Sequence, residues 1–152
     1  MEFSRTVAPA CENDLSHVMK MIFDLAKFEG MESSVKIDSQ QLCEDFKNNK
    51  FHCFVCKDRD EIIGFALYVF TFDLDCGKNV YLEDFFVKEK YRNQGVGGEI
   101  WDHLIEKCQK EDCSFLEFSV LNWNINAIQF YLNHGAKNCT KIDCREVYRL
   151  AI

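Results

Sequence analysis

The fold of this 152-residue chain is decided by one stretch, Tyr91-Arg92-Asn93-Gln94-Gly95-Val96-Gly97-Gly98. An extended apolar run over residues 81–87 leads into it, and a helical pattern begins near Gly97. A strand, a glycine-rich turn and a helix N-terminus in that order bind anions, because the turn amides and the helix dipole both offer positive potential. Arg92 adds a permanent charge that can hold a phosphate through two hydrogen bonds. The stretch therefore predicts a pyrophosphate site.

The glycine spacing distinguishes between kinds of pyrophosphate site. A Walker loop would end in Gly-Lys-Ser or Gly-Lys-Thr, which this stretch lacks. A dinucleotide fold would place G-x-G-x-x-G in a βαβ array near the start of a domain, but here the only such turn lies after residue 90. The remaining pattern, Arg-x-x-Gly-x-Gly after a strand, resembles the coenzyme A signature of the GCN5-related N-acetyltransferases, the GNAT superfamily.

Length and composition fit a single domain over residues 1–152. The chain is 47% hydrophobic, has one proline, Pro9, and contains no Gly/Ser-rich stretch that would act as a linker. No apolar run approaches the roughly 18 residues of a membrane span, and the N-terminus is too polar for a signal peptide. We therefore expect a soluble, cytoplasmic protein.

The charge balance bears on possible partners. The chain has 18 basic and 25 acidic residues, which give a net charge of −7. Nucleic acid or an anionic membrane would require a basic face, so neither is expected as a partner. The negative charge is compatible with a cationic small molecule.

The cysteines and histidines form no site of their own. An odd count of nine cysteines without a secretory signal favours reduced thiols. Cys53 and Cys56 have zinc-like spacing, but positions i and i+3 of a strand point to opposite faces. The four histidines are scattered, and no Ser-His-Asp or Cys-His arrangement occurs. We expect neither a metal nor a covalent acyl-enzyme.

Hydrophobic periodicity predicts alternating strands and helices. The predicted strands cover residues 3–8, 51–57, 61–72, 81–87, 114–120 and 146–152. The predicted helices run from Asn13 or Asp14 to about Phe28, from Asp38 or Ser39 through Phe46, from about Gly97 through Cys108, and over residues 126–132. This order indicates an α+β domain with a central, largely antiparallel sheet.

A second motif lies in residues 121–136, which read Leu-Asn-Trp-Asn-Ile-Asn-Ala-Ile-Gln-Phe-Tyr-Leu-Asn-His-Gly-Ala. It resembles the fourth helix of the GNAT superfamily. The resemblance implies that Asn124 bonds the pantetheine arm of acetyl-CoA and that Tyr131 faces the thioester sulfur. A phenol can protonate the departing thiolate, since the pKa of tyrosine, about 10, lies above that of a thiol, about 8.5.

Three further segments carry a closer resemblance. They are Tyr81-Leu82-Glu83-Asp84-Phe85-Phe86-Val87 before Tyr91-Arg92, Leu25-Ala26-Lys27-Phe28-Glu29, and Tyr68-x-Phe70-Thr71-Phe72-Asp73 before Gly77-Lys78. From about residue 5 to 136 the chain resembles the diamine acetyltransferases, the spermidine/spermine N1-acetyltransferase family. That family implies the GNAT fold, acetyl-CoA as donor, and a homodimer whose acidic side chains bind the acceptor amine at the subunit interface. The cofactor-binding residues that the two motifs imply are Phe85, Phe86, Val87, Arg92, Asn93, Gln94, Gly95, Val96, Gly97, Gly98, Asn124 and Tyr131.

The chemistry of an amine acceptor requires carboxylates. A primary amine has a pKa near 10.4, so freeing the nucleophile at neutral pH costs roughly 4 kcal/mol. Successive strand residues face opposite ways, so only one of Glu83 and Asp84 can face the cleft. The resemblance selects Glu83 to orient the amine and accept its proton through water, which leaves Asp84 on the other side. Glu29, Glu32 and Asp73 match or neighbour the acidic positions where the family holds the polyamine tail.

The preferred amine stays open. Leu121 resembles the thialysine-acetylating branch of the family, whereas Asp73 resembles the polyamine branch. Leu74-Asp75-Cys76 replaces the family's tryptophan before Gly77-Lys78, and the short C-terminus puts an arm exchanged between subunits in question. We expect direct attack of the amine on the thioester in a ternary complex. The alternatives are a non-catalytic acetyl-CoA-binding regulatory module and a protein N-acetyltransferase.

Overall fold

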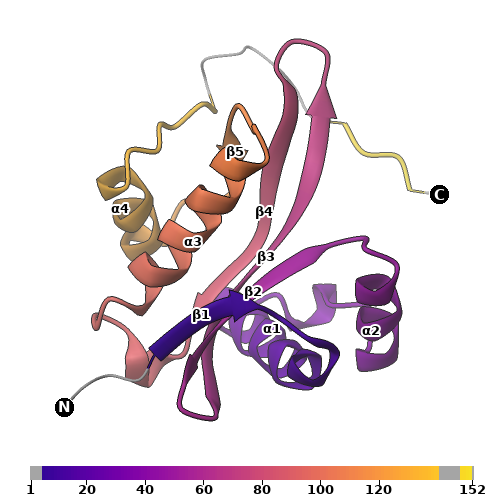
Figure 1. The fold of residues 1–152 in the computed structure, drawn as a ribbon, viewed down its shortest axis with the longest axis vertical. Coiled ribbons are helices and arrows are strands. Elements are labelled where there is room, and N and C mark those ends of the chain that lie inside the picture. The colour runs from indigo at the N-terminus through magenta and orange to yellow at the C-terminus, as the bar shows by residue number, and fades with distance from the viewer. Residues whose placement is uncertain (1–4, 141–147, 152) are drawn as a thin grey trace. The chain divides into compact units, whose positions relative to one another are not determined.

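The structure is a computed structural model that describes residues 5–140 and 148–151 (Figure 1). The chain forms two compact units, residues 1–119 and 120–152. The first unit contains β1 (Arg5–Pro9), α1 (Leu15–Glu29), α2 (Ser39–Lys47), β2 (His52–Asp58), β3 (Glu61–Asp73), β4 (Gly77–Val87), α3 (Val96–Lys110) and β5 (Leu116–Glu117). The second contains α4 (Ile125–Asn133).

The five strands of the first unit form one sheet in the order β1-β2-β3-β4-β5. The first three pairings are antiparallel, and β4 pairs with β5 in parallel. The predicted α+β class with a mostly antiparallel mixed sheet is therefore confirmed. Within the described residues, no helix is long and apolar enough to cross a membrane.

Helices cover both faces of this sheet. Phe86 of β4 pairs with Phe65 of β3, and both belong to the buried cluster that α1 and α2 complete with residues such as Leu15 and Leu42. Phe85 points to the opposite face, because neighbouring strand residues alternate, and its ring lies 6.3 Å from that of Trp101 of α3. The sheet thus has an α1/α2 face and an α3 face.

Several predicted boundaries are wrong for identifiable reasons. β4 begins at Gly77 rather than at residue 81, because its pairing with β3 continues to the last pair, Asp73 with Gly77. Only residues 74–76 remain for the turn between the two strands. The strand expected over residues 114–120 shrinks to Leu116–Glu117, since only these two residues pair with β4. The predicted strand over residues 146–152 falls mostly outside the described residues, and residues 148–151 are not in a strand.

Gly64 of β3 lies where neighbouring atoms leave no room for a side chain. A Cβ built on Gly64 would lie 2.9 Å from Ile100 Cδ1 of α3 and 2.9 Å from the carbonyl oxygen of Phe86. We expect Gly64→Ala to lower the free energy of unfolding by about 1–3 kcal/mol, because the strand carbonyl cannot move aside. Urea unfolding measures this loss. Gly98→Ala is the matched control, since its Cβ would meet open space and should not destabilise the helix. Equal stability of the two variants would contradict the clash.

Candidate active site

The turn that connects β4 to α3 has the geometry of an anion site. Gly95 adopts φ 83° and Asn93 φ 58°, conformations that reverse the chain before α3 starts at Val96. The Glu99 amide donates to the Gly95 carbonyl at 3.0 Å, the first hydrogen bond of the helix. The amides of the preceding helical residues therefore project from its N-terminus. These include the predicted cofactor residues Val96, Gly97 and Gly98.

The predicted residues of this turn contribute in different ways. Arg92, Asn93, Gln94 and Gly95 are exposed, so their side chains and backbone are accessible to a ligand. Val96 is only 1% exposed, because its side chain anchors α3 in the core. Val96 can therefore serve a ligand only through its backbone.

Arg92 is directed by the strand that precedes it. Its Nε donates to the Val87 carbonyl at 2.9 Å, and this bond fixes the orientation of the guanidinium group. An anion would then be bound by the two remaining nitrogens, Nη1 and Nη2. The guanidinium carbon lies 5.6 Å from the ring centre of Phe28 and 5.4 Å from that of Phe86. The C-terminal end of α1 therefore lies beside the cofactor turn.

The role of Arg92 leads to a direct expectation. Arg92→Ala should weaken acetyl-CoA binding about tenfold, because the variant lacks the guanidinium group that the sequence predicts to bind the pyrophosphate. Isothermal titration calorimetry measures the change in dissociation constant. An unaltered dissociation constant would exclude Arg92 from the pyrophosphate site.

The acidic pair of β4 lies at a β-bulge. Leu67 of β3 pairs with Asp84, and the next residue, Tyr68, pairs with Leu82, so Glu83 is an extra residue without a partner in the register. The strict alternation expected for Glu83 and Asp84 therefore fails here. Asp84 shares the α1/α2 face with Phe86, and Glu83 is exposed.

Asp84 is the most perturbed carboxyl group in this region. Burial, together with the negative charges of Glu83 and Glu29, raises the pKa of Asp84 to about 6. Burial also raises the pKa of Glu29, the last residue of α1. The three carboxyl groups thus form an acidic cluster that favours a cation, and they lie in the strand and helix whose Phe86 and Phe28 contact Arg92.

Two other predicted substrate residues lie outside this cluster. Asp73 caps the β3–β4 turn: its Oδ1 accepts from the amides of Asp75 and Cys76 at 2.9 and 2.7 Å, and its Oδ2 accepts from Asn79 Nδ2 at 2.8 Å. Asp73 pairs with Gly77, so roughly 20 Å of strand separates it from Asp84. Glu32 is exposed in a short 3-10 turn after α1.

The second unit places its predicted residues on one helix face. Asn124 caps α4, and its Oδ1 accepts from the Ala127 amide at 3.3 Å. Tyr131 follows seven residues later, which is nearly two turns, so the two side chains share a face about 10 Å apart along the axis. Leu121 precedes the helix and accepts a hydrogen bond from the Asn124 amide at 2.9 Å. This spacing suits an extended ligand arm along the helix.

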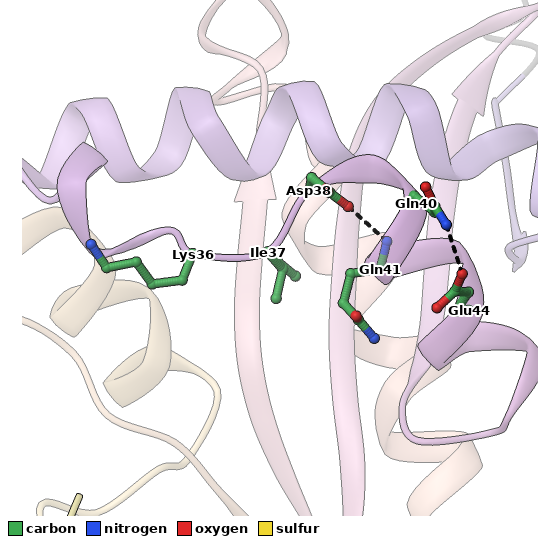
Figure 2. A pocket seen from close by; sticks show the side chains of 6 residues that line it. All are labelled: Lys36, Ile37, Asp38, Gln40, Gln41 and Glu44. Atoms are coloured by element: carbon green, nitrogen blue, oxygen red, sulfur yellow. Dashed lines mark hydrogen bonds between the residues drawn. The ribbon is translucent and has the colours of Figure 1, made fainter. Parts of the chain in front are cut away.

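The structure contains a depression of about 460 Å³ at the start of α2, lined by Lys36, Ile37, Asp38, Gln40, Gln41 and Glu44 (Figure 2). Asp38 caps the helix there, with its Oδ1 accepting from the Gln41 amide at 2.8 Å. All its lining residues come from one segment of nine residues and none was predicted functional. Within the described part of the chain, no group of three or more His, Cys, Asp or Glu residues could hold a metal.

A strand, an anion-binding turn and a helix N-terminus beside a mixed sheet suit a protein that binds the pyrophosphate of a coenzyme. Residues 19–136 match the Acetyltransferase (GNAT) family, and the chain belongs to that family. The chain is accordingly an N-acetyltransferase, and acetyltransferases of this family use acetyl-CoA as co-substrate.

Similar proteins have related functions. A thialysine N-epsilon-acetyltransferase from Mus musculus is 34% identical over 148 residues, covering 91% of this chain and 87% of that protein. The Sus scrofa protein of the same name is 33% identical, covering 90% of this chain and 86% of its own length. A spermidine/spermine N(1)-acetyltransferase-like protein from Homo sapiens is 30% identical, covering 90% of this chain and 21% of that protein.

Solved structures share the fold at lower identity. The crystal structure of a transcriptional regulator from Bacillus halodurans superposes with a TM-score of 0.78 at 21% identity, covering 97% of this chain and 99% of the other. An aminoglycoside acetyltransferase from a soil metagenomic sample gives a TM-score of 0.76 at 17% identity, covering 97% and 95%. These likenesses support the GNAT fold alone.

Proposed function

We propose that this protein transfers the acetyl group of acetyl-CoA to a primary amine of a small cationic molecule, by direct attack in a ternary complex. The observation that carries the proposal is the acidic cluster of Glu29, Glu83 and Asp84 beside the Arg92 turn. A cationic acceptor placed there would be adjacent to the cofactor. The cluster also argues against a pure acetyl-CoA-binding module, which would need no buried carboxyl group.

The residues of the cofactor turn fit acetyl-CoA, which supplies the acetyl group as an activated thioester. Arg92 and the amides at the α3 N-terminus would hold the pyrophosphate, while Asn124 and Tyr131 would line the pantetheine arm. Phe85, Phe86 and Val87, at the end of β4, are proposed to bind the cofactor as well. The fit rests on the open N-terminus of α3 and the left-handed turn at Gly95.

Glu83 and Asp84 would have different roles in binding and deprotonating the acceptor amine. Glu83, exposed at the bulge, orients the reacting amine and accepts its proton through water. Asp84, whose pKa is raised to about 6, is ionised at neutral pH at an energetic cost, and a cation bound beside it would remove that cost, because an opposite charge lowers a carboxyl pKa. Tyr131 donates a proton to the departing thiolate.

Two classes of acceptor fit the site. Thialysine, the substrate in the names of several relatives, is favoured by Leu121. A polyamine is favoured by the name of the human relative and by the resemblance of Asp73 to the polyamine branch, although the β3–β4 turn engages both carboxylate oxygens of Asp73. Thiol release from acetyl-CoA with spermidine, spermine, putrescine, thialysine and lysine in parallel tests the proposal. Selective release with thialysine or with a polyamine would identify the class. Acetyl-CoA binding without release with any of them would favour the protein-acetyltransferase or binding-module alternatives.

The assembly and location remain proposals. We infer a single catalytic domain over residues 1–152 in a cytoplasmic homodimer. The β3–β4 hairpin supports the dimer, since Phe72 and Leu74 at its tip are 74% and 95% exposed. A second subunit there would cover these side chains and lie beside Asp73. The eight cysteines of the described residues are free thiols.

A further inference from the structure

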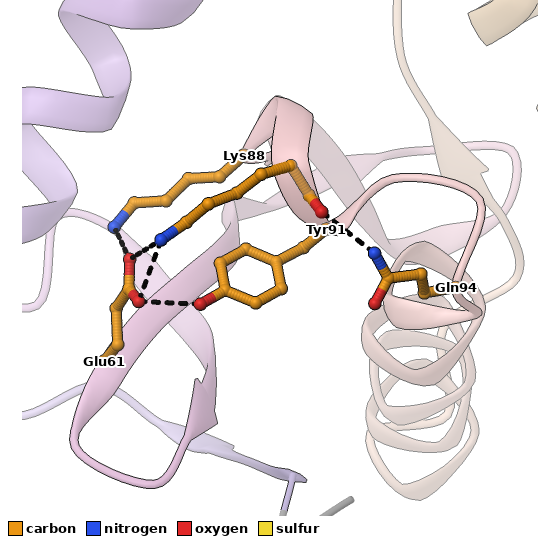
Figure 3. Close-up of polar contacts among 5 residues, drawn as sticks. Glu61, Lys88, Tyr91 and Gln94 are labelled. Atoms are coloured by element: carbon orange, nitrogen blue, oxygen red, sulfur yellow. Dashed lines mark hydrogen bonds and ion pairs between the residues drawn. The ribbon is translucent and has the colours of Figure 1, made fainter.

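The turn that carries Arg92 is tied to the first residue of β3 (Figure 3). The Glu61 carboxylate accepts a hydrogen bond from the Tyr91 hydroxyl at 2.7 Å and pairs with Lys88 Nζ at 3.0 Å and Lys90 Nζ at 3.2 Å. One carboxylate thus holds three residues of the segment just before Arg92. Exposed single ion pairs contribute little, but a network with a charge-assisted hydrogen bond fixes geometry more firmly.

The network continues into the cofactor turn. Gln94 Nε2 donates to the Lys90 carbonyl at 2.9 Å, and the Gln94 carbonyl accepts from Arg5 Nη1 of β1 at 2.8 Å. Arg5 also pairs with Glu99, in the first turn of α3, at 2.9 Å. The turn is therefore held on one side by Glu61 and on the other by Arg5.

The protonation states suit this arrangement. The hydrogen bonds from Tyr91, Lys88 and Lys90 lower the pKa of Glu61 to about 2, so its carboxylate is charged at neutral pH. The same bond raises the pKa of Tyr91, whose hydroxyl stays a donor. The tie between them therefore persists over the whole physiological pH range.

We propose that Glu61 is a positioning residue for acetyl-CoA binding, which acts through Tyr91 and Lys88 to hold Arg92 and the turn amides in their binding geometry. The inference rests on the proposed role of residues 92–98 in holding the pyrophosphate. Glu61 itself does not touch the reacting atoms. A preorganised turn avoids the entropy cost of ordering at the moment of binding.

The sign of the expected effect separates positioning from simple electrostatics. Glu61→Gln removes a negative charge near an anion site, which by itself would tighten coenzyme A binding. Loss of positioning would weaken it. Tyr91→Phe breaks the shortest tie without changing any charge at neutral pH, so it tests positioning alone.

The experiment measures coenzyme A dissociation constants at 0.15 M salt for both variants and for their combination. We expect each single variant to bind about fivefold more weakly. The double variant should be little worse than either, because both changes break the same tie. Glu106→Gln is the matched control: Glu106 pairs with Lys110 at 2.8 Å on α3, and its removal should leave coenzyme A binding unchanged.

Turnover with S-acetylpantetheine, a donor without the pyrophosphate, separates positioning from general damage. It should be unchanged in Tyr91→Phe and Glu61→Gln. Equal losses with both donors, or unchanged coenzyme A binding in Tyr91→Phe, would overturn the inference, as would tighter binding in Glu61→Gln. If Arg92→Ala weakens coenzyme A binding and these variants do not, only the role of Glu61 fails. If Arg92→Ala also has no effect, the assignment of the turn itself fails.

Discussion

Replacing Tyr131 with Phe should lower the rate of acetyl transfer by about a hundredfold and leave the dissociation constant of acetyl-CoA nearly unchanged. The expected loss follows from removing a general acid, which typically contributes at least this factor. The ring of Tyr131 would remain in place on α4, so the contacts that a ring makes with the cofactor arm should persist. Without the phenol, the thiolate would have to leave unprotonated.

Single-turnover measurements at saturating amine test this prediction, because they report the chemical step separately from product release. Tyr148→Phe is the matched control, since it removes a phenol from a residue that is 85% exposed. That variant should transfer acetyl at the wild-type rate. An unchanged rate in Tyr131→Phe would remove Tyr131 as the acid, and a parallel rise in the dissociation constant would indicate a binding role instead.

The parts of the fold that local patterns encode could be predicted from the sequence. The turn between β4 and α3 is predictable because strand, glycines and helix are contiguous in the chain, and α1 and α3 follow from their apolar periodicity. The long β3–β4 hairpin was predicted too short, since Lys78 and Asn79 look like turn residues until the pairing with Phe72 and Thr71 is known.

The acidic site shows where sequence reasoning reaches its limit. Strand alternation assigns Glu83 and Asp84 to opposite faces, but a bulge depends on the register of two strands and leaves no mark in one of them. Likewise, Glu61 lies 30 residues before Tyr91, and no spacing rule predicts their hydrogen bond. Asp73 has the residue type of a substrate ligand, yet the turn uses both of its carboxylate oxygens.

Asp84 couples the stability of the protein to its proposed function. Its pKa of about 6 in the folded protein exceeds the ordinary value of 3.8. At 1.36 kcal/mol per pH unit, the difference corresponds to a destabilisation of roughly 2–3 kcal/mol when the group is ionised. For a carboxyl group whose pKa is raised by folding, this penalty is absent below about pH 4 and is fully present above about pH 6. Above pH 6 the free enzyme therefore carries an unfavourable charge that a cation bound beside Asp84 would offset.

Asp84→Asn should accordingly stabilise the free enzyme by roughly 2–3 kcal/mol above pH 6 and leave its stability unchanged near pH 4. The same variant should lose about tenfold in kcat/KM for a cationic amine, because the amide cannot pair with the cation, while acetyl-CoA affinity stays constant. Thermal unfolding of wild type and variant at both pH values, together with initial rates, measures both effects.

The control is Asp102→Asn, the same change at an exposed position of α3, which should alter neither quantity. If the stability difference between wild type and Asp84→Asn is the same at both pH values, ionisation of Asp84 does not destabilise the folded protein. An unchanged kcat/KM would remove Asp84 from the acceptor site, and the acidic cluster would then reduce to Glu83 and Glu29.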